Sequence, residues 1–325
     1  MSQRDLVDPE LRGPLETLLA ICPGGLGAIA DPVARRARAT ALREQWLAGM
    51  PPDTTVMAED RRVPGPPGAP DVPVRVYRPA GRDGEVLPGV LFVHGGGMVI
   101  GDLDSEDITA RWLCREVGAV VVSSGYRKAP EHVHPAQLDD CDAALAWTVA
   151  HAAGLGLDPG RLAVVGGSAG GNLVLGLARR ARDRGDVPAV RLAMAWYPML
   201  DPRHLTPASR EFTDVGFWDH DADVQAWAWF LGGAEPDADA APALIDDVAG
   251  LPATFLDVGT VDLLRDDVIA FGARLAAAGV PLELHVHPGM FHAAETVAPD
   301  ADLSHRVQAA RLSALHRALA PVADG

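Results

Sequence analysis

The stretch LAVVGGSAGGNLVLGLARRAR, residues 162–182, places a single serine, Ser168, between two pairs of glycines. Strand-forming apolar residues precede the glycines, and apolar residues at helical spacing follow them. Glycine adopts backbone angles and allows close approaches that a Cβ would forbid. The stretch therefore predicts a sharp strand-to-helix turn with Ser168 at its tip.

Gly166, Ser168 and Gly170 fit the pattern G-x-S-x-G in the strand-turn-helix context that a nucleophilic serine requires. A serine hydroxyl is a weak nucleophile unless a base can reach it, so the pattern needs partners elsewhere in the chain. The alternative is a glycine-rich turn that cradles a phosphate. The stretch contains neither G-K-[ST] nor G-x-G-x-x-G, which favours the nucleophile.

Strand-like and helical segments alternate from residue 72 onward, and several of the strands are nearly continuous apolar runs. Such runs are typical of parallel strands buried on both faces. The pattern predicts an α/β fold with a mostly parallel central sheet flanked by helices. Residues 1–50 are predicted to form helices, each beginning at Asp-Pro, and residues 201–249 a helical insertion in which the segment GGAEPDADAAPAL is a surface linker.

The composition limits the classes of partner. The chain has 325 residues, 28 Lys and Arg against 44 Asp and Glu, and a formal net charge of −16. This surplus repels phosphate backbones and anionic lipid surfaces, so nucleic acid and a stable membrane association are not expected. No window contains the roughly 18 apolar residues that a membrane span needs, and no signal peptide is evident, which predicts a soluble cytoplasmic protein.

Cysteine usage indicates neither a disulfide framework nor a zinc site. Cys22, Cys114 and Cys141 are odd in number, widely spaced and without a CxxC pair. They are interpreted as buried apolar side chains.

A second glycine cluster follows the apolar run VLFV, where His94 precedes Gly95, Gly96 and Gly97. Consecutive glycines leave backbone N–H groups free to bind a developing oxyanion, and Ala169, directly after the serine, offers a further N–H group. A flexible turn is the alternative. The later G-x-S-x-G motif favours the oxyanion hole.

A base and an acid that orients it are expected in the chain order Ser, Asp, His. Asp262 follows an apolar strand, and His292 lies in the loop after the next strand. Competing acids are Asp257, within the strand, and Asp266 and Asp267, which suit the first turn of the following helix.

Two further groups of residues resemble metal ligands by type only. His285 and His287 share one face of a strand without a third ligand at a recognisable spacing, so they are interpreted as ordinary strand histidines. Asp219, His220, Asp221 and Asp223 are interpreted as a helix N-terminus with acids in its first turn. No metal or cofactor is predicted. The aromatic residues of the insertion mostly form its own core, with one or two of them facing a ligand.

Five motifs of the sequence together resemble those of a known family. HGGGMVIGD, YRKAPEHVHPAQLDDCDAALAW, GGSAGGNL, GTVDLLRDD and LELHVHPGMFH together look like the hormone-sensitive-lipase-like carboxylesterases, the bacterial HGGG-type esterases of the α/β-hydrolase superfamily. The resemblance implies a catalytic triad of Ser168, Asp262 and His292. It implies an oxyanion hole formed by the backbone N–H groups of Gly96, Gly97 and Ala169. It also implies a hydrolase core of residues 51–200 and 250–325, under a cap of residues 1–50 and 201–249.

Three residues depart from the family pattern. Gly167 stands where Asp or Thr is common, Met98 where an aromatic residue is usual, and Gly125 where Asp is frequent. None of them removes a catalytic group, but they leave the subfamily and the acyl preference open. Glu131 is implied to order the loop near the nucleophile, with an exposed carboxylate at a helix start as the alternative.

The resemblance implies a serine carboxylesterase that hydrolyses short- to medium-chain acyl esters and needs no cofactor. An amidase or formamidase would use the same triad. A ligand-binding protein on a hydrolase scaffold is a third hypothesis, although such proteins typically lose a triad member. The expected partner is a small acyl ester, and a homodimer remains open.

Overall fold

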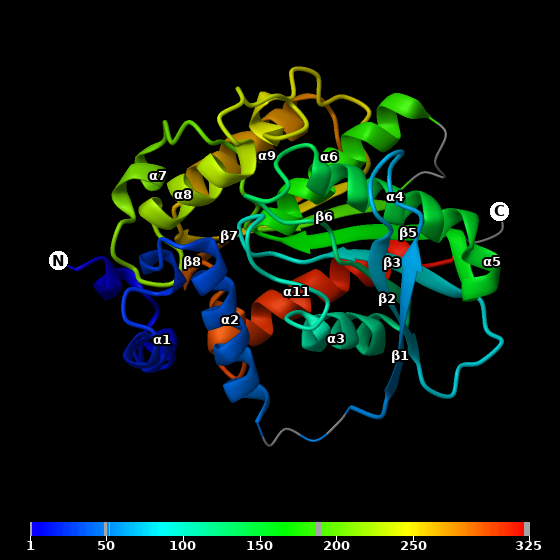
Figure 1. Ribbon diagram of the computed structural model, residues 1–325, viewed down its shortest axis with the longest axis horizontal. Coiled ribbons are helices and arrows are strands. Elements are labelled where there is room, and N and C mark those ends of the chain that lie inside the picture. Colours follow the sequence, from blue (N-terminus) through cyan, green and yellow to red (C-terminus); the bar gives the residue numbers. More distant parts are fainter. Residues whose placement is uncertain (1, 49–50, 52, 186–189, 322–325) are drawn as a thin grey trace.

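A twisted eight-stranded sheet runs through the centre of the molecule (Figure 1). The computed structural model of the chain describes residues 2–48, 51, 53–185 and 190–321. The strand order is β1-β2-β4-β3-β5-β6-β7-β8. The strands span the ranges β1 Val56–Val63, β2 Val72–Pro79, β3 Leu87–Val93, β4 Val120–Ser124, β5 Leu157–Gly167, β6 Leu192–Trp196, β7 Thr254–Val261 and β8 Leu282–Phe291.

The strands from β4 across to β8 run parallel, whereas β1 and β2 pair antiparallel with each other and β2 pairs antiparallel with β4. All residues of β4 and β6 are buried, as expected for apolar strands covered on both faces. The predicted α/β class with a mostly parallel sheet is confirmed. Because the parallel strands end at one edge of the sheet, the loops that follow β3, β5, β7 and β8 meet there.

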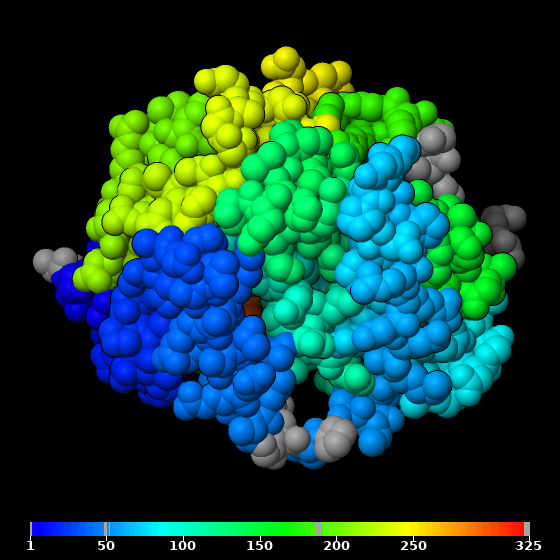
Figure 2. Space-filling view, viewed as in Figure 1, coloured from blue at the N-terminus to red at the C-terminus, as the bar shows by residue number. Residues whose placement is uncertain are grey.

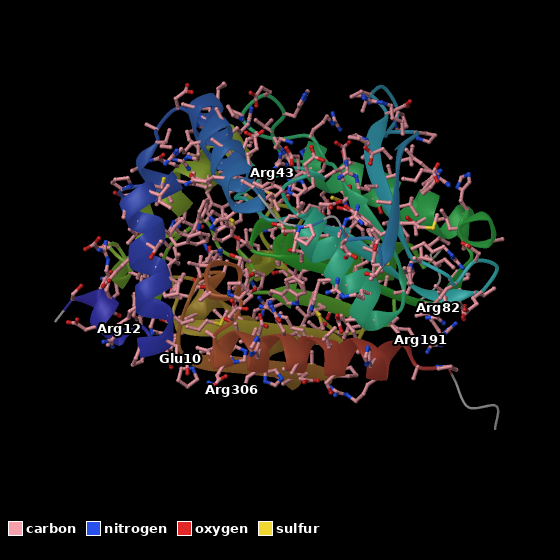
Figure 3. The ribbon with its side chains drawn as sticks, turned by 90° about the horizontal axis from the view of Figure 1, so that it is seen from below. Glu10, Arg12, Arg43, Arg82, Arg191 and Arg306 are labelled. Atoms are coloured by element: carbon pink, nitrogen blue, oxygen red, sulfur yellow. The ribbon has the colours of Figure 1, made fainter. Side chains whose placement is uncertain are left out.

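Helices cover both faces of the sheet. Figure 1 shows α3 and α11 beneath one face and α4, α6 and α9 over the other, and α3 lies beside α11 in the view from below (Figure 3). The α-helices span the ranges α1 Pro9–Ile21, α2 Pro32–Leu47, α3 Asp107–Val117, α4 Ala136–Ala150, α5 Ala152–Leu155, α6 Ala169–Arg184, α7 Pro207–Glu211, α8 His220–Leu231, α9 Arg265–Ala277, α10 Ala294–Val297 and α11 Asp302–Leu319. Three 3₁₀ turns are η1 Gln3–Leu6, η2 Leu26–Ala28 and η3 Pro242–Leu244.

The two N-terminal helices begin where the Asp-Pro pairs predict. Asp8 accepts a hydrogen bond from the backbone N–H of Glu10, and Asp31 accepts one from that of Ala34. Each following proline occupies the first turn, where its missing N–H costs nothing. The start of α1 is also tied to the sheet, because the Asp8 N–H donates to the carbonyl of Gly289 in β8.

The insertion at residues 201–249 is helical, as predicted, with α7, α8 and η3. Residues 232–235 are exposed, as predicted for the surface linker at residues 232–244, but the end of this segment is not a surface linker. Ala240, Ala241 and Pro242 are buried, and the Asp239 carboxylate pairs with the guanidinium of Arg180 on α6 at 2.9 Å. Alanine and proline supply the small apolar contacts, and the ion pair fastens the segment to α6.

Strand β1 was not predicted from the sequence. Its burial is confined to the end residues Val56 and Val63, with exposed or half-buried side chains between them. An edge strand that pairs only with β2 needs neither an apolar run nor an alternating pattern.

None of the helices in the part of the chain described here is long and apolar enough to cross a membrane.

Candidate active site

The turn after β5 explains why one serine stands between two pairs of glycines. Ser168 has φ +57° and ψ −118°, a strained conformation for a residue with a side chain. A Cβ on Gly166 would lie 2.6 Å from the backbone of Gly170, and one on Gly170 would lie 2.1 Å from the carbonyl oxygen of Val93. Only hydrogen atoms fit at these contacts, so the glycines let the turn pack against β3 while the Ser168 hydroxyl faces His292.

Ser168, His292 and Asp262 form one hydrogen-bonded chain. The Oγ of Ser168 lies 3.0 Å from Nε2 of His292, and Nδ1 of His292 lies 2.9 Å from Oδ2 of Asp262. The other carboxylate oxygen of Asp262 accepts the backbone N–H of Leu264 at 3.0 Å. The structure therefore brings together the serine, base and acid that the sequence predicts, from the ends of β5, β8 and β7.

The electrostatic setting of His292 favours its protonated form. Burial alone would lower the pKa of His292, but the charge of Asp262 and its hydrogen bond outweigh burial and raise this pKa above its ordinary value. Asp223 and Glu295 add to the same effect. The imidazole is thus a base that takes up a proton readily next to the serine hydroxyl.

The HGGG loop lies beside Ser168 and carries free donors. Gly96 has φ +107° and Gly97 has φ +59°, which a side chain would disfavour. Within the described ranges, the N–H groups of Gly96, Gly97 and Ala169 donate no hydrogen bond. His94 supports the loop from below, because its ring stacks on Tyr126 at 4.1 Å and the Tyr126 hydroxyl donates to the His94 carbonyl at 3.0 Å.

The competing acids have other partners. Asp257 lies within β7 and pairs with the buried guanidinium of Arg311 at 2.6 Å, and Asp266 accepts the backbone N–H of Ala208 at 2.8 Å. Asp267 lies in the first turn of α9 as predicted, and burial together with neighbouring carboxylates raises its pKa to about 7.

Several of the candidate metal ligands are engaged in other contacts. His285 pairs with Glu283 at 2.8 Å, and its ring lies parallel to that of His287. Asp219 accepts the N–H groups of Val215 and Gly216, not those of α8 that a capping residue would bind. In residues 2–48, 51, 53–185 and 190–321, no group of three His, Cys, Asp or Glu side chains is arranged to hold a metal ion.

Two departures from the family pattern have a steric reason. A Cβ on Gly167 would meet the ring of Tyr197 at 3.2 Å, so Tyr197 occupies the space into which a larger residue would extend. A Cβ on Gly125 would lie 3.0 Å from Pro73. Met98 is buried with φ +63°, for which the contacts give no evident reason.

Glu131 accepts two hydrogen bonds from Arg36 of α2, at 2.7 and 2.6 Å. The same arginine donates to the carbonyl oxygens of Val99 and Ala129. Glu131 therefore connects its loop to an N-terminal helix and to the loop that follows the HGGG motif, although its side chain is about half exposed.

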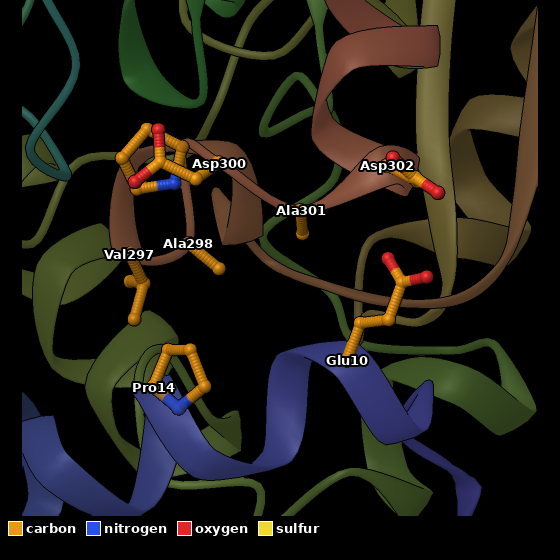
Figure 4. Close-up of a pocket in the computed structure, with 8 residues that line it drawn as sticks. Glu10, Pro14, Val297, Ala298, Asp300, Ala301 and Asp302 are labelled. Atoms are coloured by element: carbon orange, nitrogen blue, oxygen red, sulfur yellow. The ribbon is translucent and has the colours of Figure 1, made fainter.

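The surface is hollowed in two places. Figure 2 shows a small hollow between the blue N-terminal helices and the green segments, with atoms of the C-terminal part of the chain at its bottom. A larger cavity of about 560 Å³ lies elsewhere, between α1 and the segment that joins α10 to α11 (Figure 4). Glu10, Asp300 and Asp302 line this cavity, and no residue of the serine, histidine and aspartate chain does.

Several residues near the site carry no sequence signal. Trp218, His204 and Tyr197 are polar or aromatic residues in irregular segments, and Arg311 and Glu295 lie on or beside the C-terminal helices. Tyr197 and Trp218 lie beside the His292 ring, whereas His204 contacts Asp223 and Arg311 contacts Glu295. Their spacing fits no motif, so the sequence does not bring them together.

Comparison with known proteins settles the family. A family model described as the alpha/beta hydrolase fold matches residues 90–296, more than half of the chain. The chain belongs to the hormone-sensitive-lipase-like carboxylesterases. The carboxylesterase NlhH of Mycobacterium tuberculosis is 37% identical, covering 98% of this chain and 99% of that protein. The esterase LipI of the same organism is 40% identical, covering 72% of this chain and 73% of its own length.

A solved structure agrees with these relatives. The bacterial heroin esterase is 36% identical and superposes with a TM-score of 0.91, covering 98% of this chain and all of that one. The hydrolase family and the carboxylesterase class that the motifs imply are thereby confirmed. The protein is a carboxylic ester hydrolase.

Proposed function

We propose that this carboxylesterase hydrolyses short- to medium-chain acyl esters by attack of the Ser168 hydroxyl on the ester carbonyl. The observation that carries the proposal is the continuous hydrogen-bonded path from Ser168 through His292 to Asp262. As the Oγ–carbon bond forms, Nε2 of His292 takes the hydroxyl proton. Asp262 holds the imidazole in the tautomer with a proton on Nδ1 and stabilises the imidazolium that results.

The developing oxyanion would be bound by the backbone N–H groups of Gly96, Gly97 and Ala169. Donors that are fixed before the reaction stabilise the transition state without reorganising, and each is worth about 3–4 kcal/mol in a well-studied protease. The support for this role is that these N–H groups, within the residues described, have no other acceptor.

The tetrahedral intermediate collapses when the bond from carbon to the alkoxy oxygen breaks and His292 returns its proton to the leaving alcohol. A water molecule then attacks the acyl-serine, again losing its proton to His292. Release of the carboxylic acid regenerates the Ser168 hydroxyl.

Residues 1–50 and 201–249 are proposed to form the cap over the substrate. Arg35 of α2 donates to the side chain of Gln225 on α8, and Arg36 donates to the carbonyl of Val99 beyond the HGGG loop. These contacts connect both segments to each other and to the oxyanion loop. The preference for short to medium acyl groups is part of the proposal because the family resemblance implies it.

Two measurements test this function. A fluorophosphonate probe should label Ser168 in the folded protein, and a series of p-nitrophenyl esters should give the highest kcat/KM for short or medium chains. Absence of both labelling and turnover would favour a ligand-binding protein on a hydrolase scaffold. Faster hydrolysis of a matched p-nitroanilide than of the ester would favour an amidase.

A further inference from the structure

Trp218 lies beside the proposed oxyanion loop and beside the proposed base, His292. Its side chain is 8% exposed, and a Cβ on Gly97 would lie 2.5 Å from Cη2 of its ring. Its ring centroid is 6.3 Å from that of His292. The indole therefore closes the space between the oxyanion loop and the histidine.

Asp223 holds the polar edge of this indole. Nε1 of Trp218 donates to Oδ1 of Asp223 at 2.9 Å, and this contact is buried. The opposite oxygen, Oδ2, lies 2.8 Å from Nε2 of His204. Both oxygens of a carboxylate that is 1% exposed thus have a partner, and each partner comes from a different loop.

The charge of Asp223 is compensated locally. Burial would lower the pKa of His204, but the hydrogen bond and charge of Asp223 outweigh burial and raise it. Asp201 and Asp267 are the other acids near this pair, and Asp267 has a pKa raised to about 7, first by burial. The raised pKa favours the protonated form of His204, whose positive charge would compensate the buried carboxylate beside it.

A buried ion pair often adds little stability compared with apolar residues of the same size, and here its two hydrogen bonds join the Trp218 and His204 segments. A tryptophan ring has two side-chain torsions, so one hydrogen bond at Nε1 and one packed edge define its position. Because Gly97 is a proposed oxyanion donor, the indole beside it would adjoin the carbonyl oxygen of a bound ester and the acyl group on the same carbon.

We propose that Asp223 and His204 are positioning residues that hold the Trp218 indole as a fixed wall beside the oxyanion hole, and that this wall limits the size of the acyl group. The inference rests on the proposed function, because it concerns the same site. It assigns the acyl-size limit to a buried pair in the insertion that does not itself touch the ester.

The test compares kcat/KM for p-nitrophenyl acetate and octanoate in four variants: Asp223→Ala, Asp223→Asn, Trp218→Phe and the Asp223→Ala/Trp218→Phe double variant. Asp223→Ala should shift the octanoate-to-acetate ratio toward octanoate by about ten-fold or more, as expected for the loss of a pocket wall. Trp218→Phe removes the N–H donor and replaces the indole by a smaller ring, so it should shift the ratio in the same direction.

Two results separate positioning from a merely structural role. Asp223→Asn keeps an oxygen that accepts the indole N–H and should retain most of the wild-type ratio. The double variant should shift the ratio no further than Trp218→Phe alone, because Asp223 acts only by holding the indole that this change removes. Asp221→Ala, an exposed acid on the same turn of α8, is the matched control and should leave the ratio unchanged.

An unchanged ratio in Trp218→Phe, or equal shifts in Asp223→Asn and Asp223→Ala, would overturn the inference. A shift along a series of alcohol groups but not along the acyl series would overturn the acyl assignment. If Asp223→Ala does not fold, the test uses the other two single variants. The octanoate-to-acetate ratio should then shift in Trp218→Phe and stay near the wild-type value in Asp223→Asn. Failure of the proposed function is distinguishable, since the wild-type protein would then neither react with a fluorophosphonate nor hydrolyse any ester of the series.

Discussion

The hydroxyl group of Tyr197 donates a hydrogen bond of 2.6 Å to Glu295, the residue three positions after His292. The Tyr197 ring stands edge-on to the His292 imidazole, with 4.8 Å between the ring centroids. Glu295 in turn pairs with Arg311 of α11 at 2.6 Å. The loop that carries the proposed base is therefore fastened from beneath by a buried network that includes the C-terminal helix.

Arg311 is the cation of this network, and its loss should be costly. Its side chain is 2% exposed and pairs with both Asp257 and Glu295. Arg311→Leu leaves two buried carboxylates without a counter-charge, so we expect the free energy of unfolding to fall by about 3–5 kcal/mol. Urea denaturation measures this loss.

The matched control is Arg317→Ala, on the same helix. Arg317 is 58% exposed and pairs with Glu283 at the surface, so its loss should cost less than about 1 kcal/mol. Similar losses for the two variants would contradict the importance of burial in the Arg311 network.

Ser168→Ala should abolish ester turnover while the fold persists. Alanine fits the turn but removes the proposed nucleophile, and loss of such a residue lowers kcat by on the order of 10⁴ to 10⁶ in serine hydrolases. Circular dichroism checks the fold, and Ser313→Ala, an exposed serine on α11, is the control. Retention of more than about a hundredth of the wild-type rate would assign the nucleophile to another residue.

The acid side of the pH profile should report His292. The neutral imidazole accepts the serine proton, and the pKa of His292 is raised because Asp262 outweighs the effect of burial. Activity should therefore be high at alkaline pH and fall as the pH drops through an apparent pKa above the ordinary value of about 6.5. The measurement is kcat/KM between pH 5 and 9.

Asp262→Asn tests whether Asp262 is the cause of the raised pKa of His292. Without the carboxylate, burial dominates, so the acid limb should move to lower pH and kcat should fall by on the order of 10⁴. A profile that is flat from pH 5 to 9 in the wild-type protein would exclude His292 as the base.

The sequence predicted the central strands, the turn at Ser168 and the order of the candidate triad because those features depend on local patterns. Apolar runs mark buried strands, and glycines mark places where backbones meet. Strand β1 escaped prediction because its middle residues carry charge and face solvent at the sheet edge. The hydrogen-bonded network beside His292 was not predicted either. Its members Tyr197, Glu295 and Arg311 are distant in sequence and meet only in the folded chain.

Asp223 shows the same limit within the insertion. The acids at residues 219–223 predict a helix N-terminus, and α8 does begin at His220. Which acid faces inward depends on the position of Trp218 and His204, and no local pattern encodes it. Sequence reasoning therefore found the helix but not the role of Asp223.

The last prediction concerns the proposed cap. Deleting residues 1–50 would remove Val7, Leu11 and Leu15 from the core, where each is at most 1% exposed, so a truncation would disturb folding together with substrate binding. Arg36→Ala is a sharper change, because it releases α2 from Val99, Ala129 and Glu131 without emptying the core.

If α2 forms a wall of the substrate site, Arg36→Ala should raise KM several-fold and weaken discrimination between acetyl and octanoyl esters. Labelling of Ser168 by a small organophosphate should change little, since the serine, histidine and aspartate chain does not touch Arg36. Glu44→Ala, an exposed position on the same helix, is the control for α2 itself. An unchanged KM and an unchanged chain-length profile in a folded Arg36→Ala protein would mean that α2 is no part of the substrate site, and the cap would then consist of the insertion alone.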